Sequence, residues 1–507
     1  MPLALDFGTC NTVIARWNEA AQRAELLHLS GLGRRYRYRL DGEAGEREAP
    51  VVPTLIHYGN GRRRLLGQQV TEEGLVDHPG TFRWVKLDVL ANSTVARRVG
   101  ERRVAPAEAA AEFVRSALTT ALAALGDLRD EELVVTMPVE AFDHYKDWLE
   151  EAVRGAFLGR VSLLDEATAC ILGYQETVRA GDVCLVFDFG GGTLDVAVVK
   201  VNPTAEGPRK CQVLGRAGDE IGGSLVDRWL LEDLKVATGI SAEEVRQVGT
   251  RLLLAVEDAK IALSSGEEEA DVTQFNDLSG RLISHTFTRK GLAEMLKRRE
   301  LFRKVAATVK RALDMARDRY GTREGDLRAA FLVGGSSLLL GVRDCVETLL
   351  PDTQIHFRDP FGSIAAGACR LVGHQIEAAT VHDYGLQSWN RETKLFDFEG
   401  VIPKGTPFPT DGVLRAKYVG TAYDNAAELN LVVWERSQVT QRAVSTLVMG
   451  PDGRMQETAG TTVQSEALRA LNPWAQDFIR PDPPCKREEL KRFVVGFGID
   501  AQQRCLV

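Results

Sequence analysis

The sequence has no long apolar run and no paired cysteines. A membrane-spanning helix needs roughly 18 consecutive apolar residues, and the best candidate, residues 329–342, is interrupted by Gly-Gly-Ser-Ser. The eight cysteines are scattered without a C-x-x-C pair or a metal-ligand spacing, which gives no sign of a zinc site or a disulfide framework. The first residues carry no basic stretch, and Asp6 interrupts their apolar character. We therefore expect no signal peptide, no membrane segment and a cytoplasmic location with reduced thiols.

Several common nucleotide and metal motifs are also missing. The sequence contains no G-x-x-x-x-G-K-[ST], no G-x-G-x-x-G and no H-E-x-x-H, which excludes a P-loop, a dinucleotide-binding turn and a zincin helix of the usual pattern. Lysine and arginine number 63 and aspartate and glutamate 71, so the net charge is −8. Such a chain has no general attraction to nucleic acid or to an anionic membrane, and we expect neither as a partner.

The 507 residues change character near residue 376. Before that point, apolar runs alternate with helical patterns such as residues 107–125, which is typical of an α/β domain. Short alternating runs follow it, and eight of the 18 prolines fall between 401 and 485, which favours an all-β domain. We predict a domain over 1–375, a linker over 376–383 and a smaller β domain over 384–507.

One short motif occurs twice, 182 residues apart. An apolar strand runs into Asp-Phe-Gly-Thr at 6–9 and another into Asp-Phe-Gly-Gly-Gly-Thr at 188–193, and a second strand follows each. Glycine lets the backbone approach a ligand, successive N–H groups in such a turn bind anions, and aspartate offers Mg²⁺ a hard oxygen. One copy alone would be an ordinary hairpin turn. Two copies predict two similar subdomains that face each other across a cleft and hold phosphates from both sides.

A predicted helix over 243–264 carries a polar face. Four residues at spacing i, i+3, i+4 and i+7 share that face: Glu257, Lys260, Ile261 and Ser264. Their polar groups could bond the ribose or base of a nucleoside. A surface ion pair beside a core isoleucine would give the same pattern.

Three other segments are ambiguous in isolation. The glycines that follow the apolar run 331–333 could face a nucleoside or simply make a strand-to-helix turn. Glu166 could hold a metal-bound water or be a favourable acid in the first turn of a helix. Lys86 alone has the character of a surface lysine.

Together and in this order, these segments resemble the seventy-kilodalton heat-shock (DnaK-like) chaperone family. Residues 5–11 resemble its first phosphate motif, 187–195 (FDFGGGTLD) its second, 165–170 its connecting segment and 332–336 (LVGGS) its adenosine motif. Weaker similarity continues beyond residue 380, at 384–386 and 493–500. The resemblance implies an α/β actin-like (ribonuclease-H-like) two-lobed ATPase domain followed by a smaller all-β sandwich, with ATP or ADP and Mg²⁺ as cofactors.

The resemblance also implies roles for individual residues. Lys86 matches the lysine beside the γ-phosphate and the attacking water, and Asp195 matches a carboxylate near it. Glu166 matches an acid in the water network of the metal. The catalytic set implied is Lys86, Glu166, Asp188, Thr193 and Asp195, and Asp6 and Asp188 are the implied Mg²⁺ carboxylates, acting through water. The implied nucleotide contacts are Asp6, Gly8, Thr9, Cys10, Asn11, Gly190, Gly191, Gly192, Thr193, Gly222, Gly223, Glu257, Lys260, Ile261, Ser264, Gly334, Gly335, Ser336 and Leu338.

Several positions depart from the family pattern. Ile261 and Leu338 stand where the family holds adenine between two arginine stems, so aliphatic walls would cover the base without cation stacking. This predicts weaker nucleotide binding or looser base selectivity. Cys10 replaces the usual threonine or serine. Residues 378–383 lack the family's leucine-rich linker, and no helical lid follows residue 500, so we expect fast peptide release and altered coupling.

Three functions fit these observations. The first is an ATP-hydrolysing chaperone that couples its nucleotide state to the binding of extended or unfolded polypeptide, and for it the resemblance allows a J-domain co-chaperone and a nucleotide exchange factor as partners. The second is a nucleotide-gated interaction scaffold with little turnover and one dedicated partner. The third is a sugar or small-molecule kinase with the same phosphate clamp. The intact Lys86, Asp188 and Thr193 favour the first.

Overall fold

The computed structural model describes most of the chain up to residue 371 and shorter stretches after residue 377. The described residues are 3–40, 45–59, 63–126, 131–139, 141–202, 211–371, 378–380, 382–390, 393, 395–404, 406–408, 410, 412–419, 425, 429–437, 442–449, 455–463, 467–471, 478–479, 483–484, 486, 493–500 and 505–507. Two compact units are present: unit 1 is Met1–Pro138, Trp148–Thr204 and Lys210–Gly373, and unit 2 is Val139–Asp147, Ala205–Arg209 and His374–Val507. Residues 376, 377 and 381 of the predicted linker lie outside the described residues.

Unit 1 is mixed α/β. Its strands are β1 (Leu3–Asp6), β2 (Asn11–Asn18), β3 (Arg23–Leu26), β4 (Arg34–Tyr38), β5 (Arg47–Pro53), β6 (Leu55–Tyr58), β7 (Arg64–Leu66), β8 (Thr81–Arg83), β9 (Arg97–Val99), β10 (Arg102–Val104), β11 (Glu132–Met137), β12 (Arg160–Asp165), β13 (Val183–Phe189), β14 (Leu194–Val201), β15 (Cys211–Asp219), β16 (Glu269–Asn276), β17 (Arg281–Thr288), β18 (Leu327–Val333) and β19 (Gln354–His356). Its helices are α1 (Gln68–Glu72), α2 (Val85–Leu90), α3 (Pro106–Leu125), α5 (Glu166–Gly173), α6 (Gly223–Thr238), α7 (Ala242–Ser264), α8 (Arg289–Arg298), α9 (Leu301–Tyr320), α10 (Val342–Leu349) and α11 (Ser363–Cys369), with 3₁₀ turns η2 (Glu324–Asp326) and η3 (Gly335–Leu338). Helix α4 (Asp143–Arg154) has its first residues in unit 2 and the remainder in unit 1.

Two sheets of unit 1 are built in the same order. The first runs β12-β11-β1-β2-β5-β4, with β3 also paired to β2, and the second runs β15-β14-β13-β18-β19. Each is centred on an antiparallel hairpin, β1–β2 or β13–β14. Two strands parallel to the first strand of the hairpin complete its other side. The motif that occurs twice in the sequence therefore forms the hairpin turn at the same topological position in both sheets.

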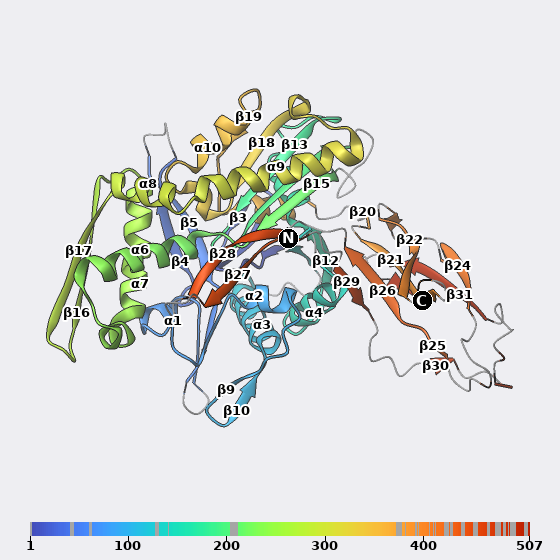
Figure 1. Ribbon diagram of the computed structural model, residues 1–507, viewed down its shortest axis with the longest axis horizontal. Coiled ribbons are helices and arrows are strands. Elements are labelled where there is room, and N and C mark those ends of the chain that lie inside the picture. Colours follow the sequence, from blue (N-terminus) through green and yellow to red (C-terminus); the bar gives the residue numbers. More distant parts are fainter. Residues whose placement is uncertain are drawn as a thin grey trace. The chain divides into compact units, whose positions relative to one another are not determined.

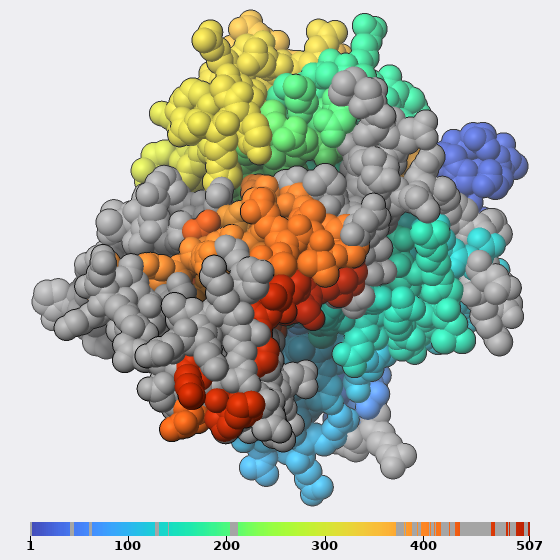
Figure 2. Space-filling view, turned by 90° about the vertical axis from the view of Figure 1, so that its right-hand side faces the viewer, coloured from blue at the N-terminus to red at the C-terminus, as the bar shows by residue number. Residues whose placement is uncertain are grey.

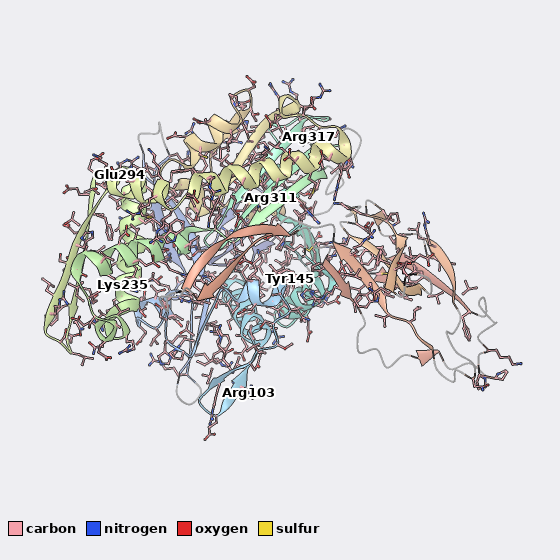
Figure 3. The ribbon with its side chains drawn as sticks, viewed as in Figure 1. Arg103, Tyr145, Lys235, Glu294, Arg311 and Arg317 are labelled. Carbon is pink, nitrogen blue, oxygen red and sulfur yellow. The ribbon has the colours of Figure 1, made fainter. Side chains whose placement is uncertain are left out.

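Helix α9 covers the second sheet (Figure 1). Its apolar face packs into the core cluster that also contains the buried residues of β13, β14 and β18. A Cβ on Gly215 of β15 would lie 2.2 Å from the carbonyl oxygen of Ala312, so glycine is what lets the helix approach this closely. Arg311, labelled in Figure 3, donates to the carbonyl of Gly218 at 2.9 Å. These contacts fix the sheet that ends in the second turn.

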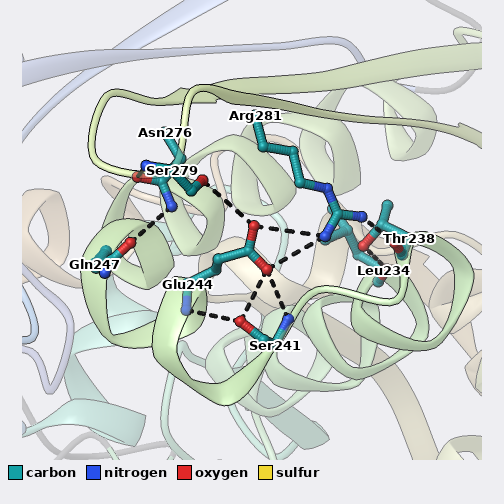
Figure 4. Close-up of polar contacts among 8 residues, drawn as sticks. All are labelled: Leu234, Thr238, Ser241, Glu244, Gln247, Asn276, Ser279 and Arg281. Carbon is teal, nitrogen blue, oxygen red and sulfur yellow. Dashed lines mark hydrogen bonds and ion pairs between the residues drawn. The ribbon is translucent and has the colours of Figure 1, made fainter.

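Helix α7, which carries the predicted nucleoside face, begins at a capping box (Figure 4). The backbone N–H of Glu244 donates to the hydroxyl of Ser241 at 3.2 Å, and the backbone N–H of Ser241 donates to the Glu244 carboxylate at 2.9 Å. Arg281 of β17 donates to the same carboxylate at 3.2 Å. The bonds that the carboxylate accepts, led by that from the Ser241 N–H, hold the pKa of Glu244 below its usual value. The cap satisfies N–H groups that a helix start leaves unpaired.

Unit 2 consists of short strands over its described residues from 378 onward. They are β20 (Ala378–Ala379), β21 (Asp383–Asn390), β22 (Leu395–Ile402), β23 (Pro407–Phe408), β24 (Arg415–Val419), β25 (Leu429–Asn430), β26 (Val433–Ser437), β27 (Arg442–Met449), β28 (Met455–Val463), β29 (Ala467–Ala470), β30 (Phe478–Ile479), β31 (Phe493–Ile499) and β32 (Cys505–Leu506). One sheet runs β22-β21-β26-β29 and another β24-β31-β32.

A small apolar core joins these two sheets of unit 2. Tyr384 from β21 and Phe497 from β31 are almost fully buried within it. The segments 384–386 and 493–500, where the sequence shows weaker family similarity, thus supply residues to one core. Figure 2 colours the described residues of this unit from 378 onward orange and red. None of the helices in the described parts of the chain combines the length and the apolar content that a membrane crossing requires.

Candidate functional site

The first Asp-Phe-Gly-Thr turn connects β1 to β2. Asp6 ends β1 and Asn11 begins β2, so residues 7–10 reverse the chain. A Cβ on Gly8 would lie 2.1 Å from the carbonyl oxygen of Asn11, which leaves room only for glycine. Thr54 donates its hydroxyl to the Gly8 carbonyl at 2.9 Å. The sequence therefore folds here into a tight turn, which the hydroxyl of Thr54 stabilises.

The second turn connects β13 to β14. Asp188 and Asp195 are directly opposite each other in the hairpin, and the Gly190 N–H donates to the Thr193 carbonyl at 2.9 Å. The Asp188 side chain is half-buried, whereas Asp195 is exposed. The register thus places two predicted catalytic carboxylates side by side at the base of the turn.

The two turns touch each other. A Cβ on Gly191 would lie 2.5 Å from Sγ of Cys10, and a Cβ on Gly192 would lie 2.7 Å from Cγ2 of Thr9. The backbone of the second turn therefore lies directly against side chains of the first. The two copies of the motif are thus brought face to face, as the sequence leads us to expect, and they touch directly.

Helix α6 begins at the second turn. A Cβ on Gly222 would lie 2.4 Å from the Gly191 carbonyl oxygen, and the Ser224 N–H donates to that same oxygen at 2.9 Å. The first N–H groups of a helix and its dipole favour an anion. The Cys10 thiol lies 3.4 Å from the Ser224 hydroxyl, and burial raises the pKa of this thiol, so Cys10 is neutral at pH 7.

A buried ion pair lies beside the turns. Lys86, which in isolation resembles a surface lysine, is only 6% exposed and donates to Oε1 of Glu166 at 2.7 Å. It lies in the first turn of α2, directly after Trp84, whose φ of 58° is left-handed. Glu166 opens α5, where Asp165 accepts a capping bond from the Thr168 N–H at 2.8 Å. A buried ammonium requires such a partner.

Asp6 and Asp188 share the electrostatic field of this pair. Burial raises the pKa of Asp6 to about 6, with a further rise from Glu166, while Lys86 and a 2.8 Å bond from the Thr136 hydroxyl oppose the rise. Burial also raises the pKa of Asp188 well above its ordinary value, and Glu166 adds to that effect. Both carboxylates are therefore costly to ionise unless a cation joins them.

This surplus of acidic groups fits Mg²⁺. Over the parts of the chain that the structure describes, no three His, Cys, Asp or Glu side chains converge as direct metal ligands. Mg²⁺ keeps several of its own waters and binds through few carboxylates plus phosphate oxygens. The assignment of Asp6 and Asp188 to water-mediated contacts with the ion stays a prediction.

The polar face of α7 meets α6. Nζ of Lys260 lies 2.7 Å from Oδ1 of Asp227 and 3.4 Å from the Gly223 carbonyl oxygen. Burial raises the pKa of Asp227 to about 6, although Lys260 opposes this. Burial tends to lower the pKa of Lys260, but Asp227 and Glu257 outweigh it and the pKa rises. Asp227 was not among the predicted residues, because nothing in its sequence context distinguishes it from other acids on an amphipathic helix.

The turn after β18 packs against the same elements. Gly334 has φ of 80°, and a Cβ there would lie 2.5 Å from Oδ1 of Asp188. Ser336 is buried, and its hydroxyl would contact a Cβ on Gly223 at 2.7 Å. The Ser264 hydroxyl accepts a hydrogen bond of 3.4 Å from the backbone N–H of Leu340, just after η3. The third predicted segment thus joins the second turn, the start of α6 and the end of α7.

Strand β4 contributes two residues that the sequence reasoning missed. Arg34 and the Tyr36 hydroxyl both donate to Oε1 of Glu257, at 2.9 and 2.8 Å. The alternating arginines and tyrosines of residues 34–38 predict a strand, but they do not reveal a partner more than 200 positions away. Ile261 and Leu338, predicted to wall the base, are half-buried.

Comparison with known proteins identifies the class. Residues 50–447 match the family model described as Hsp70 protein. The chain therefore belongs to the Hsp70 family, which confirms the resemblance of its motifs and implies an actin-like two-lobed ATPase domain.

The curated relatives are named as chaperones. Chaperone protein dnaK of Trieres chinensis is 26% identical over 472 residues, covering 86% of this chain and 72% of the relative. Chaperone protein dnaK of Guillardia theta is 26% identical over 450 residues, covering 85% and 69%. Heat shock 70 kDa protein 7, chloroplastic, of Arabidopsis thaliana is 27% identical over 414 residues, covering 79% and 55%. Family and relatives together support a chaperone with ATP-binding character.

Proposed function

We propose that this chain is a Mg²⁺-dependent ATPase that couples its nucleotide state to the binding of extended or unfolded polypeptide. The observation that carries the proposal is the contact between the two glycine turns, with the Lys86–Glu166 pair buried beside them. Family membership supports this assignment, since Hsp70 proteins are ATPases. We infer that water is the acceptor of the phosphoryl group.

The residues of the two turns would hold the phosphates and the metal. Backbone N–H groups of the turns and the start of α6 suit phosphate oxygens, and Thr9 and Thr193 add hydroxyl donors. Mg²⁺ would supply charge neutralisation for the β- and γ-phosphates. Asp6 and Asp188 would hold its waters, and the raised pKa of each carboxyl is the cost that the cation offsets.

Lys86 and Glu166 would orient the attacking water. The ammonium of Lys86 is fixed by its 2.7 Å bond to Glu166, so it offers its other N–H groups in defined directions. Asp195 would accept a proton or a hydrogen bond on the exposed side. Phosphoryl transfer of this kind depends on positioning and charge stabilisation more than on covalent catalysis.

We further propose a domain division of 1–375, 376–383 and 384–507, in which the last part is a β-sandwich that binds peptide. The shared core of β21 and β31 supports a packed β domain. An extended peptide would add backbone hydrogen bonds and place apolar side chains in a pocket. A J-domain co-chaperone and a nucleotide exchange factor complete this proposal by analogy with the family, and the proposed cytoplasmic location rests on the sequence alone.

A nucleotide-gated scaffold is the second candidate. Residues 378–383 read Ala-Ala-Thr-Val-His-Asp and lack a run of leucines. In this alternative, nucleotide would act as a conformational ligand and the β domain would hold one dedicated partner.

Single-turnover hydrolysis of ATP with Mg²⁺ tests both candidates. We expect the wild-type protein to release phosphate and Lys86→Ala to bind ATP with similar affinity but hydrolyse it at least 100-fold more slowly, the scale of a lost electrostatic contact in a reaction site. Lys290→Ala is the matched control, because this lysine lies exposed on α8. Binding without hydrolysis by all three proteins would favour the scaffold, and transfer of phosphate to a sugar would indicate the kinase.

A further inference from the structure

A layer of aromatic side chains lies beside the predicted nucleoside contacts. The rings of Tyr36 and Phe361 are stacked, with centroids 5.3 Å apart and planes 12° apart. Tyr38 packs on the same Phe361 ring at 5.4 Å. The guanidinium of Arg34 lies over the ring of Tyr36, 3.9 Å from its centroid. One strand, β4, supplies Arg34, Tyr36 and Tyr38, and Phe361 comes from the segment before α11.

This layer is joined to the predicted nucleoside residues on two sides. On one side, Arg34 and Tyr36 share Oε1 of Glu257 on α7. On the other, the edge of the Phe361 ring would contact a Cβ on Gly335 at 2.8 Å, and Leu338 and Phe361 both pack against the buried cluster that contains Tyr38. A polar and an apolar anchor therefore hold the aromatic layer against the two segments on which the nucleoside contacts were predicted.

We propose that Tyr36 and Phe361 form the wall that recognises the base of the bound nucleotide, and that Arg34 and the Tyr36 hydroxyl orient Glu257 toward the ribose. This inference rests on the proposed function, because it concerns the same nucleotide. It assigns base recognition to β4 and Phe361, which no motif indicates. Strand β4 lies before residue 50, where the family match begins.

The chemistry of this wall determines what it selects. The half-buried Phe361 ring, backed by Tyr36, offers a polarisable apolar surface, and Leu338, which packs against the same buried cluster, adds aliphatic area. A stacked aromatic surface favours the larger face of a purine over a pyrimidine and discriminates weakly between purines. We therefore expect ADP and GDP to bind within a few-fold of each other and CDP to bind about tenfold more weakly.

Calorimetric titration of the full chain with Mg²⁺ and four probes tests the wall. The probes are ADP, GDP, CDP and pyrophosphate, and the variants are Phe361→Leu and Tyr36→Leu. Phe361→Leu should weaken ADP about tenfold, the scale of one aromatic stack on a base, and Tyr36→Leu should weaken it less, because Tyr36 supports the Phe361 ring. Each should leave pyrophosphate, which has no base, unchanged, and the preference for ADP over CDP should disappear.

Tyr36→Phe separates the ring from the hydroxyl. It keeps the stack on Phe361 and removes only the donor to Glu257. We expect about threefold weaker ADP binding and no effect on 2′,3′-dideoxy-ADP, which lacks the ribose hydroxyls that Glu257 would contact. Because Phe replaces Tyr with little change in volume, this variant still tests the proposal if the leucine variants fail to fold.

The outcomes distinguish this inference from the proposed function. Unchanged ADP affinity in Phe361→Leu and Tyr36→Leu, with tight binding by the wild type, would overturn the base wall and leave the ATPase proposal intact. Equal weakening of ADP and pyrophosphate would also overturn it, because the side chains would then act on the fold as a whole. Wild-type protein that binds neither ADP nor pyrophosphate would overturn both.

Discussion

The two glycine turns of unit 1 occupy the same place in sheets of the same order, yet they differ in their electrostatic surroundings. Asp6, in the first turn, accepts a hydrogen bond from Thr136 and has a pKa of about 6. Asp188, in the second turn, faces Asp195 across its hairpin, and its pKa is raised well above the ordinary value. The carboxyl group of the first turn is thus partly compensated by a hydrogen bond, whereas the second turn places two carboxyl groups opposite each other.

The two turns also differ in the groups that they present at their contact. The second turn also has three glycines and contacts the start of α6, where N–H groups suit an anion. The first turn has side chains, Thr9 and Cys10, that fill the space against those glycines. The second turn therefore presents mostly backbone, and the side chains of the first turn pack against it.

The largest expected effect comes from filling the contact between the turns. Gly191→Val would put branched carbon atoms where a single Cβ already lies 2.5 Å from Sγ of Cys10. The turns would have to separate, and we expect ATP affinity to fall at least 100-fold, because positioning of the phosphates would be lost. Gly325→Ala is the control, since a Cβ there meets nothing within 4 Å. Fluorescent-nucleotide titration measures both, and normal binding by Gly191→Val would show that the turns need not touch.

A smaller effect should follow from neutralising each aspartate separately. In the absence of nucleotide at pH 7, Asp188→Asn should increase the free energy of unfolding by more than about 1.4 kcal/mol, which corresponds to a tenfold change in the folding equilibrium. Asp6→Asn should increase it less, because its pKa is raised less. Urea denaturation measures both, and equal gains would remove the electrostatic distinction between the turns.

The pH dependence of the wild-type protein gives the sign of this effect. An aspartate in the unfolded chain loses its proton near pH 4, whereas Asp6 keeps its proton up to about pH 6. Between these values the folded state binds more protons, so its contribution to stability is full below pH 4 and is lost as the pH rises through 6. Asp6→Asn should flatten this part of the stability profile. An unchanged profile would contradict the raised pKa.

The sequence predicted the two turns and that they face each other, because the motif that forms each turn is local; their direct contact is seen only in the structure. Two aspartates, two threonines and the glycines between them predict both hairpins, and the proposed phosphate contacts rest on the same residues. The role proposed for Lys86 rests on family resemblance, and the structure adds that Lys86 is buried and donates to Glu166. The α7 face was predictable from its helical spacing.

The aromatic layer could not be predicted in this way. Arg34 and Phe361 are separated by more than 300 positions and by several elements, and neither belongs to a motif. Their proximity depends on how the hairpin β4–β5 is placed by the sheet, which is a tertiary effect that local patterns do not encode. The same reason explains why Asp227 and Thr136 were missed, since each matters only through a partner on a distant element.

The smallest expected effect would make the two turns more alike. Thr136→Val removes the hydroxyl that donates to Asp6 at 2.8 Å and preserves the shape of the side chain. We expect a loss of about 1 kcal/mol in the free energy of unfolding at pH 7, together with a further rise in the pKa of Asp6 toward that of Asp188. Thr286→Val is a matched control, because it removes a similar bond to Asp271 from an exposed strand pair, where water replaces the donor. Equal losses in the two variants would mean that burial around Asp6 does not strengthen its bond. The pKa of Asp6 would then be lower than that of Asp188 because of Lys86 rather than because of Thr136.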